Sequence, residues 1–125
     1  MDSSSCVSFL FIKGEIQEQG IQLMSVLASS EQNCLTLVGG RTFIVALEAM
    51  KKHFDCQGVQ AAGCQLLECL AGLEPNRKIL VQQNILVVIL RALQNFQDCI
   101  DVQKSGFTAL ALLTEALAEK LQHSK

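Results

Sequence analysis

The chain of 125 residues has no tryptophan, no tyrosine and only one proline, and it contains no long apolar run. A membrane-spanning helix needs about 20 consecutive apolar residues, whereas apolar runs such as Phe9–Ile12 and Ile85–Leu90 are far shorter. Basic residues are not in excess either, because the net charge is −2, so the chain lacks the positive surface that neutralises phosphates. These absences argue against a membrane or nucleic-acid partner. Half of the residues are hydrophobic, which is typical of a folded domain rather than a disordered chain.

A secretory signal is also missing, because no Lys or Arg precedes Phe9–Ile12 and no small-residue cleavage site follows it. We therefore expect a cytoplasmic or nuclear protein whose six cysteines are thiols and not disulfides. No C-x-x-C pair is present, so the sequence predicts neither a metal site nor a cofactor. His53 and Cys56 stand three residues apart, and we interpret them as a loop histidine beside a half-buried thiol.

A repeat with a period of 43 residues runs through the chain. Ile16–Gly20 aligns without gaps with Val59–Gly63 and with Val102–Gly106, and the apolar positions that follow coincide in all three copies. Good helix formers dominate, so each unit is predicted to contain three helices. The predicted short helices cover residues 32–38 and 76–83, the second helices 42–53 and 85–96, and the third helices 14–28, 58–73 and 100–121.

Several residues are predicted to begin or end these helices. Asn33 and Asn76 can cap the short helices by accepting a backbone N–H, and Gly39-Gly40 is predicted to break the chain before the second helix. Pro75 is expected to hold Glu74 outside a helix.

The third helices carry a glycine at the same position of each repeat. These residues are Gly20, Gly63 and Gly106. Glycine inside a helix costs about 1 kcal/mol relative to alanine. Its recurrence in register therefore predicts that a neighbouring helix packs too close for a side chain.

A unit of this length with short, medium and long helices resembles the armadillo repeat. The residues that carry the resemblance are Asn76–Val81, Ile85–Leu93 and the V-Q-x-x-G-x-x-x-L-x-x-L pattern of Val102–Leu113. The short helix favours armadillo over HEAT repeats, which have two helices per unit. The V-Q-x-x-G-C-x-x-L form at Val59–Leu67 is similar to the armadillo region of leucine-rich-repeat kinases.

The resemblance implies an all-α fold, a right-handed α-solenoid of three-helix repeats. Residues 1–13 would form an atypical N-terminal segment, and residues 14–125 the armadillo-repeat domain. Its units would cover about 14–56, which includes the partial repeat, 57–99 and 100–125.

In armadillo proteins the third helices line a concave groove that binds peptides or proteins. Peptide-binding members grip their ligand with Trp and Asn four residues apart, and the matching positions here hold neither residue type. What remains is a mildly polar stripe with an apolar lower edge, which we expect to contact a flat protein surface or an amphipathic helix. A solvated face without a dedicated ligand is the alternative. The stripe comprises Glu18, Gln22 and Val26, then Ala61, Gln65 and Cys69, then Lys104, Thr108 and Leu112.

The first repeat is incomplete, because the register starts inside its second helix. A solenoid needs about three repeats and polar ends to be stable alone. We therefore expect a fragment, an alternative start or one stretch of a longer array. Exposed Phe9, Phe11 and Ile12 would then promote self-association through this end.

Catalysis is not expected. The histidines are His53 and His123, no Ser or Cys has a base at matching helical spacing, and Gly39–Thr42 lacks the P-loop pattern. Two hypotheses remain. The first is a non-enzymatic interaction module, an adaptor or scaffold that docks a partner on the third-helix stripe. The second is a regulatory or spacer armadillo segment of a larger, kinase-linked signalling protein.

Overall fold

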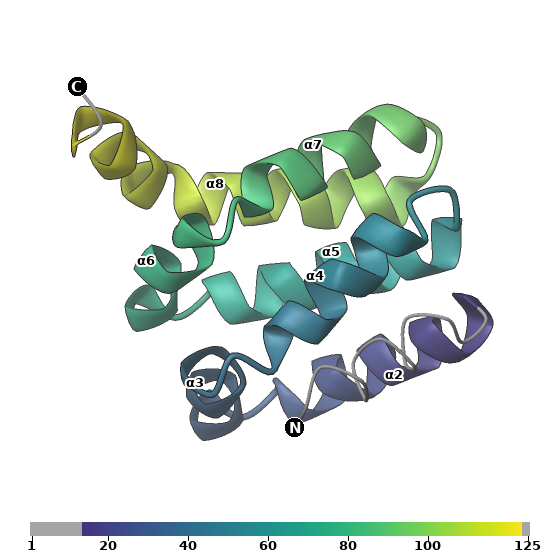
Figure 1. Ribbon diagram of the computed structural model, residues 1–125, viewed down its shortest axis with the longest axis horizontal. Coiled ribbons are helices and arrows are strands. Elements are labelled where there is room, and N and C mark those ends of the chain that lie inside the picture. Colours follow the sequence, from purple (N-terminus) through teal and green to yellow (C-terminus); the bar gives the residue numbers. More distant parts are fainter. Residues whose placement is uncertain (1–13, 124–125) are drawn as a thin grey trace.

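The computed structural model describes residues 14–123, which form stacked units of three helices (Figure 1). The helices are α2 (Gly14–Leu27), α3 (Glu31–Gly39), α4 (Phe43–Lys52), α5 (Gln57–Ala71), α6 (Glu74–Gln82), α7 (Ile85–Asn95) and α8 (Ile100–His123). The third helix of each unit packs on its counterpart in the next, so that α5 lies between α2 and α8. In the same way α3 contacts α6 and α4 contacts α7. The predicted all-α solenoid is confirmed, and each third helix ends within two residues of its predicted bounds.

The middle third helix, α5, is enclosed on most of its circumference. It packs against α2, α8, α4 and α6, and its apolar residues recur every three or four positions, as one helical face requires. Only Gln57 and Gln65 of this helix are exposed. Between α2 and α8, α5 is therefore exposed to solvent only along a narrow strip. This strip forms part of the site described below.

The recurrent glycines lie where the second helix of the unit approaches the third. A Cβ atom on Gly63 would overlap the buried side chain of Met50 in α4. A Cβ atom on Gly106 would come within 2.8 Å of Cδ2 of Leu93 in α7, and Met50 and Leu93 are themselves 43 positions apart. The predicted close approach is confirmed at these two glycines. The matching neighbour of Gly20 would be residue 7, which lies outside the described residues.

In α5 and α8, a glutamine side chain bonds to the end of the second helix of the same unit. Nε2 of Gln60 donates to the carbonyl oxygens of Met50 (2.9 Å) and His53 (3.0 Å). Gln103, one repeat later, donates in the same way to Leu93 and Phe96, both at 3.0 Å. The last carbonyls of a helix have no partner within the helix, so these amides satisfy them.

The predicted asparagine caps are wrong. Ser30 caps α3, because its hydroxyl accepts from the backbone N–H of Asn33 at 3.4 Å. Asn76 lies buried inside α6, where its side chain donates to the carbonyl of Leu70 at 3.0 Å and reaches that of Cys34 at 3.5 Å. It therefore ties α6 to the preceding unit instead of capping a helix.

The start of α6 also differs from the prediction, because Glu74 is its first residue and Pro75 lies within its first turn. Proline is compatible with this position, since the first backbone N–H groups of a helix have no acceptor within the helix.

In both units, the turn between the first and second helices has a residue with left-handed backbone conformation at the same repeat position. Arg41 has φ 63° and Asn84 has φ 58°, and the two are 43 positions apart. The chain does break at Gly39-Gly40 as predicted, since α3 ends at Gly39. Neither glycine has a positive φ. The reversal is therefore made by Arg41, a residue type that is strained in this conformation.

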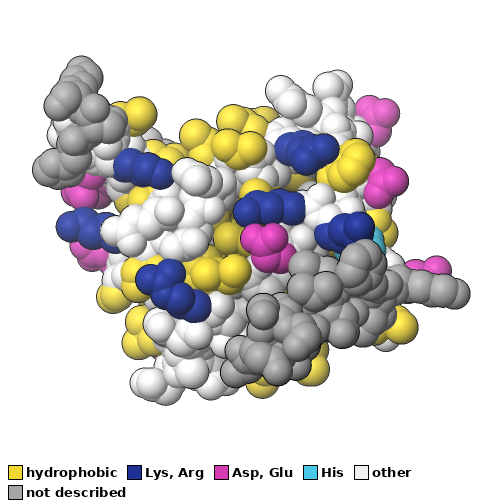
Figure 2. Space-filling model, viewed as in Figure 1, with side chains coloured by type: hydrophobic (Ala, Val, Ile, Leu, Met, Phe, Trp, Pro, Cys, Tyr) yellow, Lys and Arg dark blue, Asp and Glu magenta, His cyan; other side chains and the backbone are white. Residues whose placement is uncertain are grey.

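The outer face of the molecule, defined here as the surface of α4 and α7, carries Lys and Arg among hydrophobic side chains (Figure 2). The guanidinium of Arg91 lies 4.2 Å from the ring centroid of Phe54, and Lys51 pairs with Glu48 at 3.2 Å. Within the described residues, no helix is both long enough and apolar enough to cross a bilayer.

Candidate functional site

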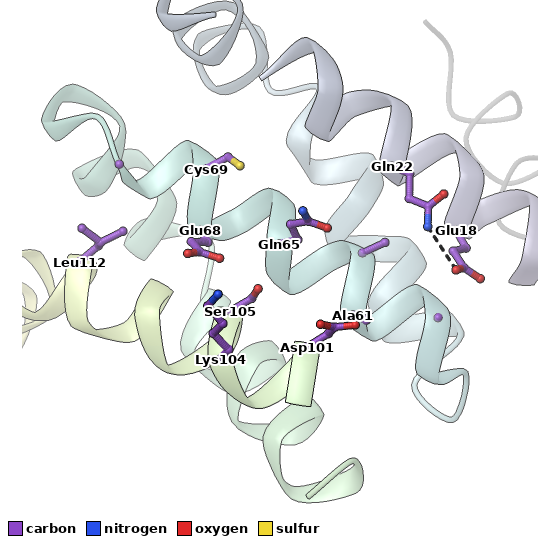
Figure 3. A pocket seen from close by; sticks show the side chains of 13 residues that line it. Glu18, Gln22, Ala61, Gln65, Glu68, Cys69, Asp101, Lys104, Ser105 and Leu112 are labelled. Atoms are coloured by element: carbon purple, nitrogen blue, oxygen red, sulfur yellow. Dashed lines mark hydrogen bonds between the residues drawn. The ribbon is translucent and has the colours of Figure 1, made fainter. Parts of the chain in front are cut away.

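A cleft of about 860 Å³ runs across the three third helices, α2, α5 and α8 (Figure 3). We call it the third-helix cleft. Its floor is the exposed strip of α5 around Gln65, and its two walls come from α2 and α8. It exists because α5 packs between the other two third helices, while no element among the described residues covers α5 on this side.

All of the predicted stripe except Val26 and Thr108 lines the third-helix cleft. The stripe residues found there are Glu18, Gln22, Ala61, Gln65, Cys69, Lys104 and Leu112. Val26 lies outside, 68% exposed, near the end of α2. Thr108 is half-buried, and its hydroxyl donates to the carbonyl oxygen of Lys104 at 2.8 Å. The two glutamines that precede it in the repeat are longer and reach the cleft, whereas this threonine bonds to its own helix.

Sequence reasoning missed some of the lining residues. They are Gly58, Ala62, Glu68, Gly72, Asp101 and Ser105. The predicted stripe took every fourth residue, which follows a single line along a helix. A helix face also includes positions three and seven residues away. Glu68 is three positions from Gln65 and Asp101 is three from Lys104, so the wider pattern could have found both of them.

Acidic side chains dominate the charge of the third-helix cleft. Glu18, Glu68 and Asp101 contribute carboxylates, and Lys104 contributes the ammonium group. Glu68 on α5 and Lys104 on α8 face the same space (Figure 3). A partner with basic side chains would therefore meet favourable charge over most of the cleft.

Two of these carboxylates lie at the N-terminal first turns of helices. The carboxylate of Glu18 lies over Gly58 in the first turn of α5, where a Cβ atom would overlap it. Nε2 of Gln22 donates to this carboxylate at 3.3 Å. Asp101 lies in the first turn of α8, beside Ala61 (Figure 3). The partial positive charge of a helix N-terminus favours a carboxylate in both places.

The apolar edge of the cleft is smaller than predicted, because Val26 lies outside it. It contains Leu112 and Cys69, which are both half-buried. Burial raises the pKa of the Cys69 thiol, and the neighbouring Glu68 raises it further. Cys69 is therefore a neutral thiol at physiological pH, suited to contact rather than to nucleophilic attack.

The chemistry that this arrangement offers is hydrogen bonding and charge pairing. Gln22 and Gln65 present amides, which donate and accept but do not titrate. Among residues 14–123 no group of three His, Cys, Asp or Glu side chains is placed to hold a metal ion.

Comparison with known families gives a match to the family model described as "LRRK2 ARM repeat", over residues 8–125. No curated protein and no solved structure matches the chain. The match confirms the resemblance to armadillo repeats, and in particular to those of leucine-rich-repeat kinases, that the sequence patterns at Val59–Leu67 and Val102–Leu113 indicated.

Proposed function

Because the chain belongs to the LRRK2 ARM repeat family, we propose that it is a non-enzymatic interaction module that docks a protein segment in the third-helix cleft. The observation that carries the proposal is the convergence of one repeat position from successive units on a single cleft. Gln22, Gln65 and their neighbours on α8 present polar groups to the same space. A surface built by repetition suits a ligand that is itself extended over several residues.

The lining defines the kind of segment that would fit. Three carboxylates against one ammonium group favour basic side chains, and the apolar edge at Cys69 and Leu112 accepts an apolar side chain from the same segment. An amphipathic helix with a basic flank, or a protein surface of that composition, meets both requirements. The free, buried thiols of Cys34 and Cys64 fit a reducing compartment such as the cytosol.

The experiment is a selection from a displayed random-peptide library on the immobilised chain, followed by fluorescence anisotropy with the selected peptides. The test variant is Gln22→Arg with Gln65→Arg, which places two guanidinium groups in the cleft at exposed positions. The matched control is Gln82→Arg with Gln94→Arg, also exposed but outside the cleft.

We expect selected peptides to be rich in basic and apolar residues and to lose at least about tenfold in affinity on the test variant, a loss of about 1.4 kcal/mol. The control variant should bind as the natural sequence does. Peptides that bind the two variants equally, or a selection that enriches nothing, would overturn the proposal. Circular dichroism of both variants checks that the helices are retained.

The family match favours a second candidate function, a regulatory or spacer segment of a larger, kinase-linked protein. In that case stacking against neighbouring repeats is the whole role, and the third-helix cleft takes no ligand. The same experiment separates the two, because a spacer is indifferent to charge in the cleft.

A further inference from the structure

The outer face has a groove of its own between α4 and α7, with a volume of about 410 Å³. We call it the outer groove. It is separated from the third-helix cleft by α5, because Gln60 of that helix lines the outer groove while Gln65 lines the cleft. Its volume falls within the range of about 300–1,000 Å³ that is usual for ligand sites.

The outer groove exists because neighbouring second helices are less tightly packed than neighbouring third helices. The third helices α5 and α8 contact each other extensively, whereas α4 and α7 contact each other much less. The side chains that reach the remaining space give it a mostly apolar surface. Met50 and Val88 are buried in it, and Val87 is 67% exposed beside them.

Each wall of the outer groove carries a cation. These are Lys51 on α4 and Arg91 on α7, and both are exposed, on a face where Lys and Arg lie among hydrophobic side chains (Figure 2). Lys51 pairs with Glu48 at 3.2 Å, but an exposed pair of this kind is weak in water. Arg91 takes part in no ion pair among residues 14–123. The charge of this groove is therefore positive, opposite to that of the third-helix cleft.

The side chain of Arg91 is held in place by the turn that follows α4. Its guanidinium lies 4.2 Å from the ring centroid of Phe54, and Nδ2 of Asn95 donates to the carbonyl oxygen of Phe54 at 3.4 Å. A guanidinium stacked on a ring can still donate in its own plane to a carboxylate. Because it is already ordered, it loses less conformational freedom when a ligand binds.

The two cations are not a property of the repeat. The positions that form the apolar floor are apolar in both units, so the groove itself follows from the repeat pattern. The counterpart of Arg91 one repeat earlier is Glu48, and the counterpart of Lys51 one repeat later is Gln94. The basic pair therefore belongs to the junction of α4 and α7 and has no role in the stacking that both units share.

We propose that the outer groove binds an acidic amphipathic helix of a partner protein. The apolar stripe of that helix would lie on Met50, Val87 and Val88, and its carboxylates would pair with Lys51 and Arg91. One cation on each wall matches a helix that has acidic residues on both flanks of its apolar stripe. The surface and its charge differ from those of the third-helix cleft, so this proposal does not depend on the proposed function.

The sequence also predicts self-association, through Phe9, Phe11 and Ile12. These residues lie outside the described residues, and the outer groove does not involve them.

The experiment is a selection on the immobilised full chain from a displayed library of amphipathic helices. The helices have about 15 residues, a length at which an isolated helix is marginally stable, with a fixed leucine stripe. Both flanks are randomised among Asp, Glu, Asn, Gln and Ser. Basic residues are left out, so ligands of the acidic third-helix cleft are not sampled. We expect Asp and Glu to be enriched over Asn and Gln on both flanks.

Fluorescence anisotropy then measures the affinity of the selected helices for single variants of the chain. Lys51→Glu and Arg91→Glu should each weaken binding by at least about fivefold, since each replaces an attraction with a repulsion. Val87→Gln should also weaken binding, because it removes apolar contact without changing charge. The matched control is Lys104→Glu, an exposed residue of the third-helix cleft. It changes the net charge by the same amount and should leave the affinity unchanged.

Enrichment of neutral flanks, or of no helix, would overturn the proposal. Selected helices that bind Lys51→Glu and Arg91→Glu as tightly as they bind Lys104→Glu would do the same. Sedimentation velocity identifies a different occupant, because self-association abolished by Lys51→Glu and by Arg91→Glu would place a second copy of the chain in the groove instead. Circular dichroism of every variant verifies that the helices are retained.

Discussion

Replacing Gln60 by leucine is expected to destabilise the chain by about 1–3 kcal/mol. The side-chain amide of this residue donates to the carbonyls of Met50 and His53, at 2.9 and 3.0 Å, where α4 ends. Leucine has nearly the same size and fills the site, but it cannot donate. The substitution therefore tests the hydrogen bonds with little change in packing.

The magnitude follows from burial. A buried acceptor left without a donor costs about 1–3 kcal/mol, and Gln60 is only 2% exposed. The carbonyl of Met50 would lose this side-chain donor, whereas the carbonyl of His53 keeps the backbone N–H of Cys56 at 3.0 Å. Burial of the leucine side chain returns of the order of 1 kcal/mol. Gln103 makes the same two bonds at the end of α7 but is only half-buried. Water can reach its carbonyls, so Gln103→Leu should cost less, about 1–2 kcal/mol.

Urea denaturation followed by circular dichroism measures the free energy of unfolding of each variant. Gln65→Leu is the matched control, because Gln65 is exposed on the same helix as Gln60, and it should change stability by no more than about 0.5 kcal/mol. The reasoning would be refuted if Gln60→Leu cost no more than the control, or if Gln103→Leu cost more than Gln60→Leu.

Burial raises the pKa of the Cys64 thiol to about 12 from an ordinary value of 9.0. The folded chain therefore keeps a proton that the unfolded chain releases above pH 9.0, so this thiol lowers the free energy of unfolding by about 1.4 kcal/mol per pH unit over that range. Cys64→Ala should remove this contribution in urea titrations below and above pH 9.0, and equal slopes would contradict it. Gly63→Ala should lose about 1 kcal/mol, because overlap with Met50 outweighs the gain in helix propensity. Gly58→Ala should be neutral or stabilising, because its methyl meets only a mobile carboxylate, and thermal denaturation of the pair tests that order. Arg41→Asn should gain about 0.5–1 kcal/mol in the same assay by relieving the left-handed conformation, and a loss would contradict that strain.

The fold could be predicted from the sequence where a residue and its neighbour both recur at the repeat spacing. Gly63 faces Met50 and Gly106 faces Leu93, so the glycine and its neighbour both recur 43 residues later. The close approach of the second helix to the third is therefore visible in two repeats of the sequence. The asparagines could not be predicted this way. Asn33 is exposed, whereas Asn76 is buried and donates its side-chain amide to the carbonyls of Leu70 and Cys34. Capping preference alone does not distinguish these two environments.

The sequence predicted one line of residues along each third helix, whereas the cleft in the structure is lined by a wider part of each helix face. The third-helix stripe identified one position in four on each helix, and the structure adds Glu68 and Asp101 from the flanks of that line. It removes Thr108, whose hydroxyl bonds to its own helix. The helical period gives the direction of a side chain, but its length and its local hydrogen bonds decide whether it reaches the cleft.

Exposure in this chain depends on place in the array more than on residue type. Ile16 and Val59 are both β-branched, aliphatic and one repeat apart, yet the first is 52% exposed and the second is 0% exposed. Sequence alone assigns them the same role, because the helix pattern around each is the same. In α5 and α8 this face meets the second helix of the same unit, as the close approach of Gly63 to Met50 and of Gly106 to Leu93 shows. For α2, the repeat positions of that second helix lie outside the described residues, so the pattern of α2 alone does not determine which of its apolar side chains are buried.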